Sequence, residues 1–412
     1  MIYNKTICAF AALLFFNGTL LFSQNAANPV TLDGCISMAR KNNSAIKIQE
    51  QKILQSGQAK LRASGARLPS ADFNYQQSAR PGDTGSAAEV SVAQPLFSGF
   101  RNKRAVEIAE SEELSARLQL ENSRRNLDSA VAGAFYALAQ TESELKNVSE
   151  TLEMMSAREK DLLIWVNLGK ARQSEIYMLQ SQISVLRSKK QKISGDRKNA
   201  LEDLSFLTGI EAPGISISEN LPEPSAAETG PAAKYLEKTG SRSDIMIAKE
   251  NVKAQALQVS RAKGNFLPAL DFNGSWYPSR SGFLSGDEWG AGLFLTIPLY
   301  RGGINRAAVN EEQEKLKEYG EALSLAQKEA RTQVCKLYAS LESSFEQVSA
   351  LKDAYSKSQS SYELQLKDYS VGMVTNLDVI QATLILLDVK NNLNNAVLQA
   401  KLNKALLDIA VK

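Results

Sequence analysis

The residues of this sequence that could do chemistry are few, and two of them stand beside a glycine. Asp378 and Gln381 lie three residues apart, on one face of an expected helix that starts just after Gly372. A carboxylate and an amide both offer polar oxygens to a ligand. Neither the break at Gly372 nor this polar pair is needed to pack a helix, so the segment calls for a functional explanation.

The rest of the composition excludes most enzyme chemistry. The 412 residues contain no histidine, which removes the commonest general base and the commonest metal ligand. There is no G-x-x-x-x-G-K-[ST] phosphate loop, no nucleophile relay and no cysteine-rich metal box. Adjacent carboxylates such as Glu311 and Glu312 are typical of a solvated helix face. We therefore expect no catalytic residues, no cofactor and no metal site. A net charge of +3, with basic and acidic residues interleaved, predicts no nucleic-acid partner.

The amino terminus has the pattern of a secretory signal peptide over residues 1–23. Lys5 forms the charged part, Ile7 to Phe22 form the apolar part, and a cut is expected after Ser23. A membrane anchor is the alternative, but the apolar run is short and is interrupted. Two cysteines remain after cleavage, Cys35 and Cys335, and their spacing is not that of a ligand pair. We expect both to be small buried side chains.

The sequence contains an internal tandem repeat. We interpret residues 24–208 and 234–412 as tandem copies, joined by a proline-rich connector over residues 209–233. Each copy would hold a helix, two strands and a long helical hairpin, with a glycine turn near residue 169 or 372. Three co-linear matches at nearly one offset carry this interpretation: "LPSADFNYQQS" with "LPALDFNGSWY", "AQPLFSGFRNKRA" with "TIPLYRGGINRAA", and "LGKARQSEI" with "VGMVTNLDV".

Four segments alternate apolar and polar side chains, as strands do. We expect strands at about 69–79, 88–97, 268–278 and 288–299. Each is long enough to cross a bilayer when tilted. Four strands cannot close a barrel, so a membrane role would require two, three or four copies of the chain. A half-buried sheet in a soluble domain is the alternative at this point.

Long helices are the strongest local signal. One core position of a heptad repeat holds Leu127, Ala134, Thr141, Val148, Met155 and Leu162, and the other holds Val131, Leu138, Leu145, Leu152, Glu159 and Val166. The second copy repeats the spacing at Val334, Leu341, Val348, Tyr355, Tyr362 and Tyr369. Such heptads predict coiled coils, and one helix over residues 102–166 would span roughly 100 Å. We interpret the tyrosine column as packing.

The whole chain after the signal segment resembles the TolC family of outer-membrane efflux proteins. The resemblance is carried by the duplicated L-P-x-x-D-F strand entry and by the paired "QPLFSGFRNKRA" and "IPLYRGGINRAA" segments. It is most specific in "YSVGMVTNLDVIQATLILLDVKNNLNNA", where the glycine turn, the D-V-I-Q-A step and the following helix all match.

This resemblance implies a mixed membrane α+β fold and a homotrimer. Four strands per protomer would contribute to a 12-stranded transmembrane β-barrel in outer-membrane lipid, and the coiled-coil helices would form a periplasmic α-barrel. The connector would join a girdle around its middle. It also implies a passive exit duct in the outer membrane of a Gram-negative bacterium, with a large periplasmic portion. Its partners would be a periplasmic adaptor (membrane fusion) protein and an inner-membrane pump of RND or ABC type.

The resemblance also assigns the hairpin tips. It implies that the adaptor docks at the periplasmic tips, formed here by Leu168, Gly169, Val371, Gly372 and Thr375. Glycine permits the tight reversal and leaves room for a partner to approach.

A constriction is expected next to these tips. Asp378 matches a ring of aspartates that projects into the pore, whereas Gln381 replaces the acidic residue of a second ring, so a cation preference should be weaker. Tyr369 and Glu175, with Ser174 beside them, match a tyrosine–acid link that holds the tips closed. Packing at the end of the tyrosine column is the alternative for Tyr369. Val374 stands where a second link has its basic residue.

One other class of protein fits part of the pattern: a secreted periplasmic coiled coil without a pore, including an adaptor subunit. An adaptor would need a single hairpin flanked by lipoyl-like β halves, and the two hairpins and two strand pairs favour the duct. The cargo stays open among drugs, metals, peptides and proteins.

Overall fold

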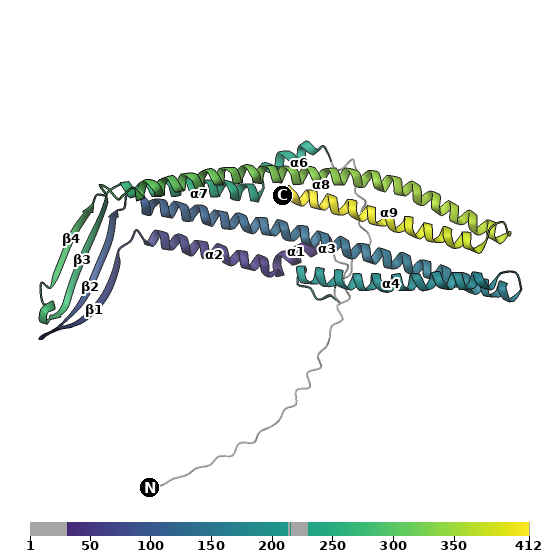
Figure 1. Ribbon diagram of the computed structural model, residues 1–412, viewed down its shortest axis with the longest axis horizontal. Coiled ribbons are helices and arrows are strands. Elements are labelled where there is room, and N and C mark those ends of the chain that lie inside the picture. Colours follow the sequence, from purple (N-terminus) through teal and green to yellow (C-terminus); the bar gives the residue numbers. More distant parts are fainter. Residues whose placement is uncertain (1–30, 213–214, 216–229, 412) are drawn as a thin grey trace, which may run out of the picture.

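The structure is a computed structural model that describes residues 31–212, 215 and 230–411. It is an elongated wall with a sheet at one end and two helical hairpin tips at the other, and both long hairpins run side by side between them (Figure 1). The expected signal segment and most of the expected connector, residues 209–233, lie outside the described residues.

Each half of the chain supplies a helix, a strand pair and a long hairpin in the same order. The elements of the first half are α1 (Leu32–Asn42), α2 (Ser44–Gly65), β1 (Ser70–Arg80), β2 (Asp83–Phe97), α3 (Arg101–Asn167) and α4 (Gln173–Thr208). Those of the second are α6 (Ala232–Lys238), η2 (Thr239–Ser241), α7 (Ser243–Lys263), η3 (Gly264–Phe266), β3 (Ala269–Ser281), η4 (Gly282–Leu284), β4 (Trp289–Thr296), α8 (Ile304–Ser370) and α9 (Asn376–Ala410).

Three strands differ from their expected bounds by three residues or more. β3 continues to Ser281, past the expected end near residue 278. β2 begins at Asp83, five residues before the expected start, because the hairpin stays paired up to Arg80 opposite Asp83. The polar residues at its start hid this part of the strand from the hydrophobic pattern. β4 ends at Thr296 rather than near residue 299, and Pro298 offers no N–H to extend the ladder.

The four strands form one antiparallel sheet in the order β1-β2-β3-β4. Across it, Phe73 lies opposite Val90, Val90 opposite Trp276, and Trp276 opposite Trp289, so that one face carries an apolar row. On the other face Glu89 accepts hydrogen bonds from Ser275 Oγ at 2.7 Å and Tyr277 OH at 3.2 Å. The isolated sheet leaves most side chains of β1 and β4 exposed.

The helices form one curved layer rather than a globular bundle. α3 packs against α2 and α7 near the sheet and against α4 and α9 toward the tips. The expected heptad positions of α3 are buried at Val131, Leu138, Val148, Met155 and Leu162. The two polar exceptions have partners: Glu159 Oε1 accepts from Gln180 of α4 at 2.8 Å, and Thr141 Oγ1 donates to the Leu138 carbonyl at 2.9 Å.

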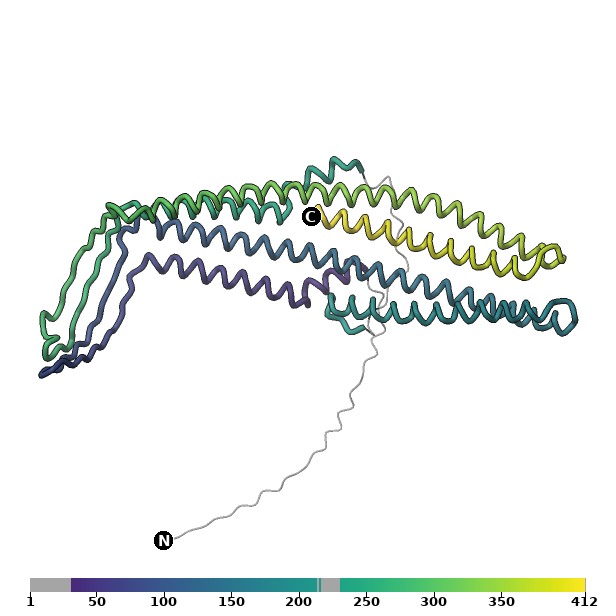
Figure 2. The backbone as a smooth tube through the Cα atoms, viewed as in Figure 1, coloured from purple at the N-terminus to yellow at the C-terminus, as the bar shows by residue number. Residues whose placement is uncertain are grey.

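Short helices lie end to end with the hairpin helices and complete the columns (Figure 2). Between α4 and α2, Asn42 Nδ2 donates to the Thr208 carbonyl at 3.1 Å. Asn43 Nδ2 donates to the Leu207 carbonyl, also at 3.1 Å. Between α9 and α7, Arg242 donates from Nη1 to the Ala410 carbonyl at 3.2 Å. In both joints a side chain that precedes one helix satisfies a terminal carbonyl of the other.

The tip half of α8 departs from the expected core. Its heptad tyrosines Tyr355, Tyr362 and Tyr369 are only half-buried, because this part of α8 lies at the lateral edge of the layer and packs mainly on α9. Tyr369, at its end, also contacts α3. The expectation for the cysteines was also wrong for one of them. Cys35 is buried, which raises its pKa to about 11, but Cys335 lies on the exposed side of α8.

Among the described residues, no helix combines the length and the apolar character needed to cross a membrane.

Candidate functional site

The two hairpin turns have the same backbone geometry. In the first, Lys170 N–H donates to Trp165 O at 2.8 Å and Gly169 N–H donates to Val166 O at 2.9 Å. In the second, Met373 N–H donates to Asp368 O at 2.9 Å and Gly372 N–H donates to Tyr369 O at 3.0 Å. Each pair of bonds is a Schellman motif with a left-handed glycine, at φ 72° for Gly169 and 80° for Gly372.

Both turns expose apolar side chains at the end of the molecule. Leu168 is 63% exposed and Val371 is 67% exposed, as expected of tip residues. Around them lie further apolar side chains that are largely uncovered. We call this set of exposed side chains the tip patch: Ile164, Leu168, Tyr177, Val371, Met373 and Leu377. Exposed apolar side chains gathered in one place mark an interaction surface.

Replacing Gly372 or Gly169 by alanine should lower stability by about 1 to 2 kcal/mol, because each glycine has a positive φ that strains an L side chain. No atom lies within 4 Å of either added Cβ, so the cost is backbone strain alone. Gly195, inside α4 and equally uncrowded, is the matched control, and there alanine should stabilise by up to about 1 kcal/mol. Thermal denaturation of the purified proteins compares the three; equal losses at all three positions would contradict the strain argument.

Asp378 has a local structural role in addition to any role in a constriction. Its Oδ2 accepts from the Thr375 backbone N–H at 2.8 Å and from the Thr375 hydroxyl at 2.6 Å, and the two residues form a capping box at the start of α9. The hydroxyl hydrogen bond, followed by the backbone one, lowers the pKa of Asp378 below its usual value. The carboxylate is therefore charged at neutral pH. The sequence T-x-x-D already contained this signal. Gln381, one turn on, is exposed.

Tyr369 lies at the centre of a cluster that joins the two hairpins. Its ring stacks on Trp165 of α3, with centroids 5.2 Å apart and planes 9° apart. The Arg158 guanidinium, also from α3, lies over the same ring at 4.1 Å. Arg158 Nε donates to Asn376 Oδ1 at 2.7 Å, which brings in the first turn of α9. We call these four residues the tip cluster: Arg158, Trp165, Tyr369 and Asn376.

The side chains of the tip cluster are partly shielded from solvent. Burial raises the pKa of Tyr369, Arg158 opposes this rise, and the charge of Glu175 adds to it. Asn376 is 1% exposed, and both its Nδ2 and Arg158 Nη2 are buried donors without a hydrogen-bond partner among the described residues. A cation over an aromatic ring contributes about 2 kcal/mol when it is desolvated.

The expected tyrosine–acid link takes a different form. Within the described part of the chain Tyr369 makes ring contacts and no hydrogen bond to Glu175, which is half-buried, while Ser174 beside it is exposed. Glu175 acts on Tyr369 through its charge alone. Val374 carries no charge, but Arg158 brings a basic group to the tyrosine from α3. Arg158 and Trp165 are seven residues apart, a heptad spacing that could have indicated a shared face.

Contacts within a hairpin and between hairpins differ in chemistry. The first hairpin is held by an apolar cluster that includes Val148, Met155, Leu179 and Ile183. The same cluster reaches the second hairpin through Ile380 and Leu387 of α9. Between α3 and α9 a polar seam runs beside these apolar contacts. Its hydrogen bonds are Asn147 to Asn391 (2.7 Å), Asn394 to Ser143 (2.9 Å), Asn395 to Glu144 (3.0 Å) and Lys390 to Glu150 (2.8 Å).

No group of three or more acidic or cysteine side chains in the described ranges could hold a metal ion.

Comparison with known proteins gives a consistent picture. Residues 238–410 match the family model described as outer membrane efflux protein. Outer membrane efflux protein BepC of Brucella suis is 23% identical over 386 residues, which cover 90% of this chain and 83% of that protein. Outer membrane protein TolC of Escherichia coli is 23% identical over 282 residues, 65% of this chain and 56% of TolC. The crystal structure of the Campylobacter jejuni CmeC outer membrane channel has a TM-score of 0.80 at 16% identity and covers 99% of this chain and 94% of CmeC.

Proposed function

We propose that this chain, which is similar to outer membrane efflux proteins, is a TolC-like channel protein of the outer membrane and that three copies of it form the passive exit duct of a tripartite export system. In this role the protein carries no motor. A periplasmic adaptor and an inner-membrane pump, of RND or ABC type, supply the energy and choose the cargo. The observation that carries the proposal is the fold of a known outer membrane channel along nearly the whole described chain.

The lateral edges of the chain support self-assembly. β1 and β4 stand at the two ends of the sheet order, and each has one side without a paired strand in the described chain. An unpaired edge cannot persist in lipid, whereas three copies would join β4 to β1 and close twelve strands. The apolar row from Phe73 to Trp289 would then face lipid, and Glu89 with its polar partners would face the lumen.

The helical edges fit the same arrangement. α2 and α4 form one side of the layer and α8 forms the other. Exposed apolar side chains lie along both sides, among them Leu54 and Leu61 on α2, Val185 on α4, and Leu325 and Leu364 on α8. The heptad spacing of α8 continues through the half-buried tyrosines, so a neighbouring copy would complete the seam that α8 lacks within one chain.

The tip patch is the proposed docking surface for the adaptor. It lies at the far end from the sheet, where a partner spanning the periplasm would meet the duct (Figure 1). Leu168 and Val371 provide apolar contact area, and the left-handed glycines beside them leave the backbone open to close approach. Thr375 contributes through the capping box rather than as an apolar contact.

The tip cluster and the polar seam together form the proposed gate. The polar seam would let one hairpin move against the other, since its exposed pair Lys390 and Glu150 can exchange partners for water. The buried pair Asn147 and Asn391 would have to become hydrated during that motion. Apolar packing keeps each hairpin intact, while the apolar contacts of Ile380 and Leu387 with the first hairpin would have to shift during that motion. The tip cluster holds the hairpins together at the narrow end, and Asp378 and Gln381 would line the axis there.

A soluble coiled-coil protein or adaptor without a pore is the alternative that the fold disfavours, since the chain has two hairpins and a sheet with two open edges. The deciding experiment is purification of the full chain from the outer membrane in detergent. A heat-modifiable trimer that conducts ions in planar bilayers is expected. A monomer that stays in solution without detergent and never conducts would rule out the duct.

Neutralising Asp378 should reduce the cation selectivity of the trimer in planar bilayers. Asparagine is the informative substitution, because its amide oxygen can keep the capping bonds to Thr375 while the charge is lost. The reversal potential under a salt gradient should move toward zero, and the melting temperature should stay near that of the wild type. Asp388→Asn, on an exposed position of the same helix, is the matched control. Unchanged selectivity in Asp378→Asn would remove this residue from the pore axis.

A further inference from the structure

The end of the sheet that joins the helices is basic and lacks acidic side chains. We call this end the junction, and the segments that meet there are residues 61–71, 94–106, 261–270 and 296–308 (Figure 1). Each segment contains two or three arginines or lysines and no aspartate or glutamate. The loop end of the sheet differs, because Asp83, Asp287 and Glu288 accompany its arginines. Positive charge is therefore in excess at the junction and not at the loop end.

Aromatic side chains lie toward both ends of the apolar face of the sheet. Trp276 and Trp289 lie opposite each other toward the loop end. At the junction Phe97 lies opposite Leu270, and Leu270 opposite Leu295, so Phe97 belongs to the same face. Leu295 follows Trp289 by six residues, roughly 20 Å of strand, which is close to the height of the apolar band of membrane strands. Aromatic side chains border such bands at the two lipid–water interfaces, so the junction would lie at the level of lipid headgroups.

An open cavity of about 400 Å³ lies at the junction, between the α2–β1 loop, the end of β2 and the start of α3. We call it the junction cavity. Two basic side chains, Arg67 and Lys103, and two aromatic ones, Phe97 and Phe100, line it. The two rings meet edge to face with centroids 5.2 Å apart, and Phe100 is 54% exposed. Cationic groups beside exposed rings suit a ligand with an anionic head and an apolar tail.

The acidic side chains nearest to the junction cavity are paired or lie on the other face of the sheet. Glu107, one turn beyond Lys103 on α3, is paired with Arg104 at 2.5 Å. Asp72 and Asp271, near the starts of β1 and β3, lie on the polar face of the sheet, whereas Phe97 lies on the apolar face. The negative charge that would balance the cavity is therefore not supplied by these neighbours.

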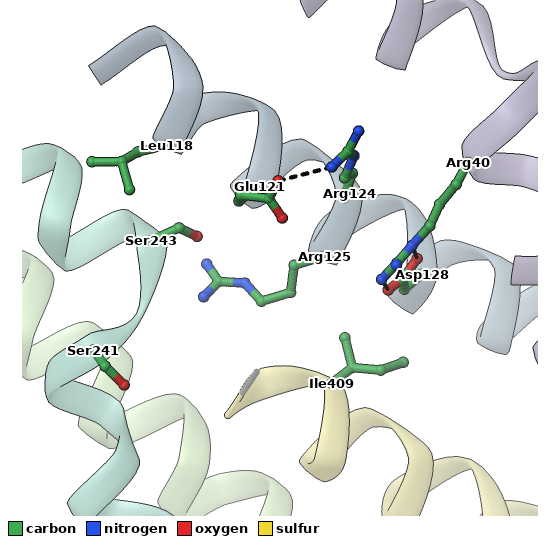
Figure 3. A pocket seen from close by; sticks show the side chains of 9 residues that line it. All are labelled: Arg40, Leu118, Glu121, Arg124, Arg125, Asp128, Ser241, Ser243 and Ile409. Carbon is green, nitrogen blue, oxygen red and sulfur yellow. Dashed lines mark hydrogen bonds and ion pairs between the residues drawn. The ribbon is translucent and has the colours of Figure 1, made fainter. Parts of the chain in front are cut away.

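Arginines midway along the molecule are balanced by carboxylates. In the cavity among α1, α3, α7 and α9 (Figure 3), Arg40 is paired with Asp128. Arg124 is paired there with Glu121 at 2.8 Å, and Glu50 lies 3.8 Å from it. The two basic side chains of the junction cavity, by contrast, are exposed and make no ion pair within the described residues.

Hydrogen bonds hold the loop that carries Arg67 in place beside Lys103. Gln94 Nε2 donates to the Arg67 carbonyl at 2.8 Å. Asn102 Nδ2 donates to the Ala66 carbonyl at 3.1 Å. Both donors line the junction cavity, so the backbone of the α2–β1 loop is fixed by side chains of β2 and α3. The two charges are thus brought to one cavity by the fold.

Phe100 has a strained backbone. Its φ of 64° lies in the left-handed region, which bulky L side chains rarely adopt. The internal repeat aligns Phe100 with Gly303, whose φ of 84° is the same kind of turn without the strain. The turn itself therefore needs no aromatic side chain. An exposed ring that is held at a cost in backbone strain indicates a function for the ring.

We propose that the junction cavity binds an anionic phospholipid of the membrane leaflet next to the helices, with Arg67 and Lys103 on the phosphate and Phe97 and Phe100 against the start of the acyl chains. This inference rests on the proposed membrane location of the sheet. Guanidinium and ammonium groups both pair with phosphate. A free phosphate would leave the exposed rings uncovered, which favours a lipid as the occupant. Bound lipid would fix the depth of the sheet in the membrane.

The junction cavity stays open to lipid in the proposed trimer. Phe97 belongs to β2, an inner strand of the sheet order. Joining β4 of one copy to β1 of the next closes the edges of the sheet and does not cover its apolar face.

Electron spin resonance of the full chain in phosphatidylcholine bilayers tests the site. Spin-labelled phosphatidylglycerol and phosphatidylcholine with the same acyl chains are compared by the fraction of each lipid that the protein immobilises. The wild type should retain an excess of phosphatidylglycerol that saturates at about one lipid per protomer. Arg67→Gln combined with Lys103→Gln should abolish this excess, because each basic side chain should strengthen binding roughly fivefold. Arg261→Gln combined with Lys263→Gln is the matched control, since it removes two exposed charges of the junction outside the cavity and should keep the saturable excess.

Phe100→Gly gives a second test that does not depend on the folding of the charge variants. Glycine relieves the left-handed strain, as Gly303 does in the second copy, so the melting temperature should not fall. The retention of phosphatidylglycerol should nevertheless weaken, because the exposed ring is lost. A variant that retains the full excess of this lipid would show that the ring has no part in binding.

The outcomes separate this site from the proposed channel. If the protein immobilises neither lipid, the sheet is not in the membrane, and the channel fails together with this site. If the wild type immobilises both lipids equally, the channel stands and the anionic-lipid site is wrong. An equal excess in the wild type and in the Arg67 and Lys103 double variant would also overturn the site. Inorganic phosphate at constant ionic strength should not displace the lipid; displacement would assign the cavity to a free anion instead.

Discussion

Replacing Arg158 by methionine should open the tip of the trimer and strongly raise its conductance in planar bilayers. Methionine keeps an apolar stem against Tyr369 but removes the cation over the ring and the hydrogen bond from Nε to Asn376. Those two contacts contribute about 2 kcal/mol and about 1.5 to 3 kcal/mol in a desolvated site. If they are lost only in the closed state, the open-to-closed ratio rises roughly a hundredfold or more per protomer.

Lys160→Met is the matched control, because Lys160 lies on an exposed position of the same helix two residues away. The control should keep the low conductance of the wild type. Combining Arg158→Met with Tyr369→Leu tests whether the two side chains act as a pair: the double variant should open little more than Arg158→Met alone. If Arg158→Met conducts like the wild type, contacts between protomers hold the tip closed and the tip cluster serves stability only.

Replacing Arg242 by methionine should cause a large loss of stability, well above that of the glycine substitutions at the tips. The Arg242 side chain is 4% exposed and donates to Asp244 at 2.8 Å, to Gln333 Oε1 at 2.8 Å and to the Ala410 carbonyl at 3.2 Å. Removing one partner of a buried ion pair typically costs about 3 to 5 kcal/mol. The joint between α7 and α9 would also lose the donor that satisfies the end of α9. Thermal denaturation of the purified protein measures the loss, with exposed Arg261→Met on α7 as the control.

The pH dependence of this loss gives a sharper test. Burial raises the pKa of Asp244, but the hydrogen bond from Arg242 and the charges of Arg125 and Arg242 together lower it below its usual value. A lowered folded-state pKa contributes stability above the unfolded value, near pH 4, and this contribution is lost as pH falls through the folded value. The gap in melting temperature between the wild type and Arg242→Met should therefore narrow below about pH 4. A gap that stays constant with pH would mean that Asp244 is not the partner that matters.

Features that depend on short spacings could be predicted from the sequence. The heptad positions Val131 and Leu138 are buried in α3, and the alternating Phe73 and Trp289 lie on one face of the sheet. Gly169 and Gly372 have positive φ in matching turns. The capping box of Thr375 and Asp378 is equally local, since its two residues are three positions apart.

Features that depend on distant segments could not be predicted in this way. Arg158 and Asn376 are 218 residues apart in the chain, and nothing near either of them indicates the other. The same holds for Arg242 and Gln333, and for Asn147 and Asn391. Cys335 shows a prediction that was wrong for the same reason. A cysteine side chain is usually buried, but the position of α8 at the edge of the layer leaves Cys335 exposed.

The sequence by itself therefore determined the elements of this protein: the long helices, the strands and the glycine turns. These follow from periodicity and from backbone freedom, which act over a few residues. Only the tertiary structure decided which polar side chains meet. Tyr369 rests under Arg158 rather than against Glu175, and Arg242 meets Asp244, Gln333 and the last carbonyl of α9. The physical reason is that such contacts are short-ranged in space but unconstrained along the chain, so they follow only from the packing of the two hairpins.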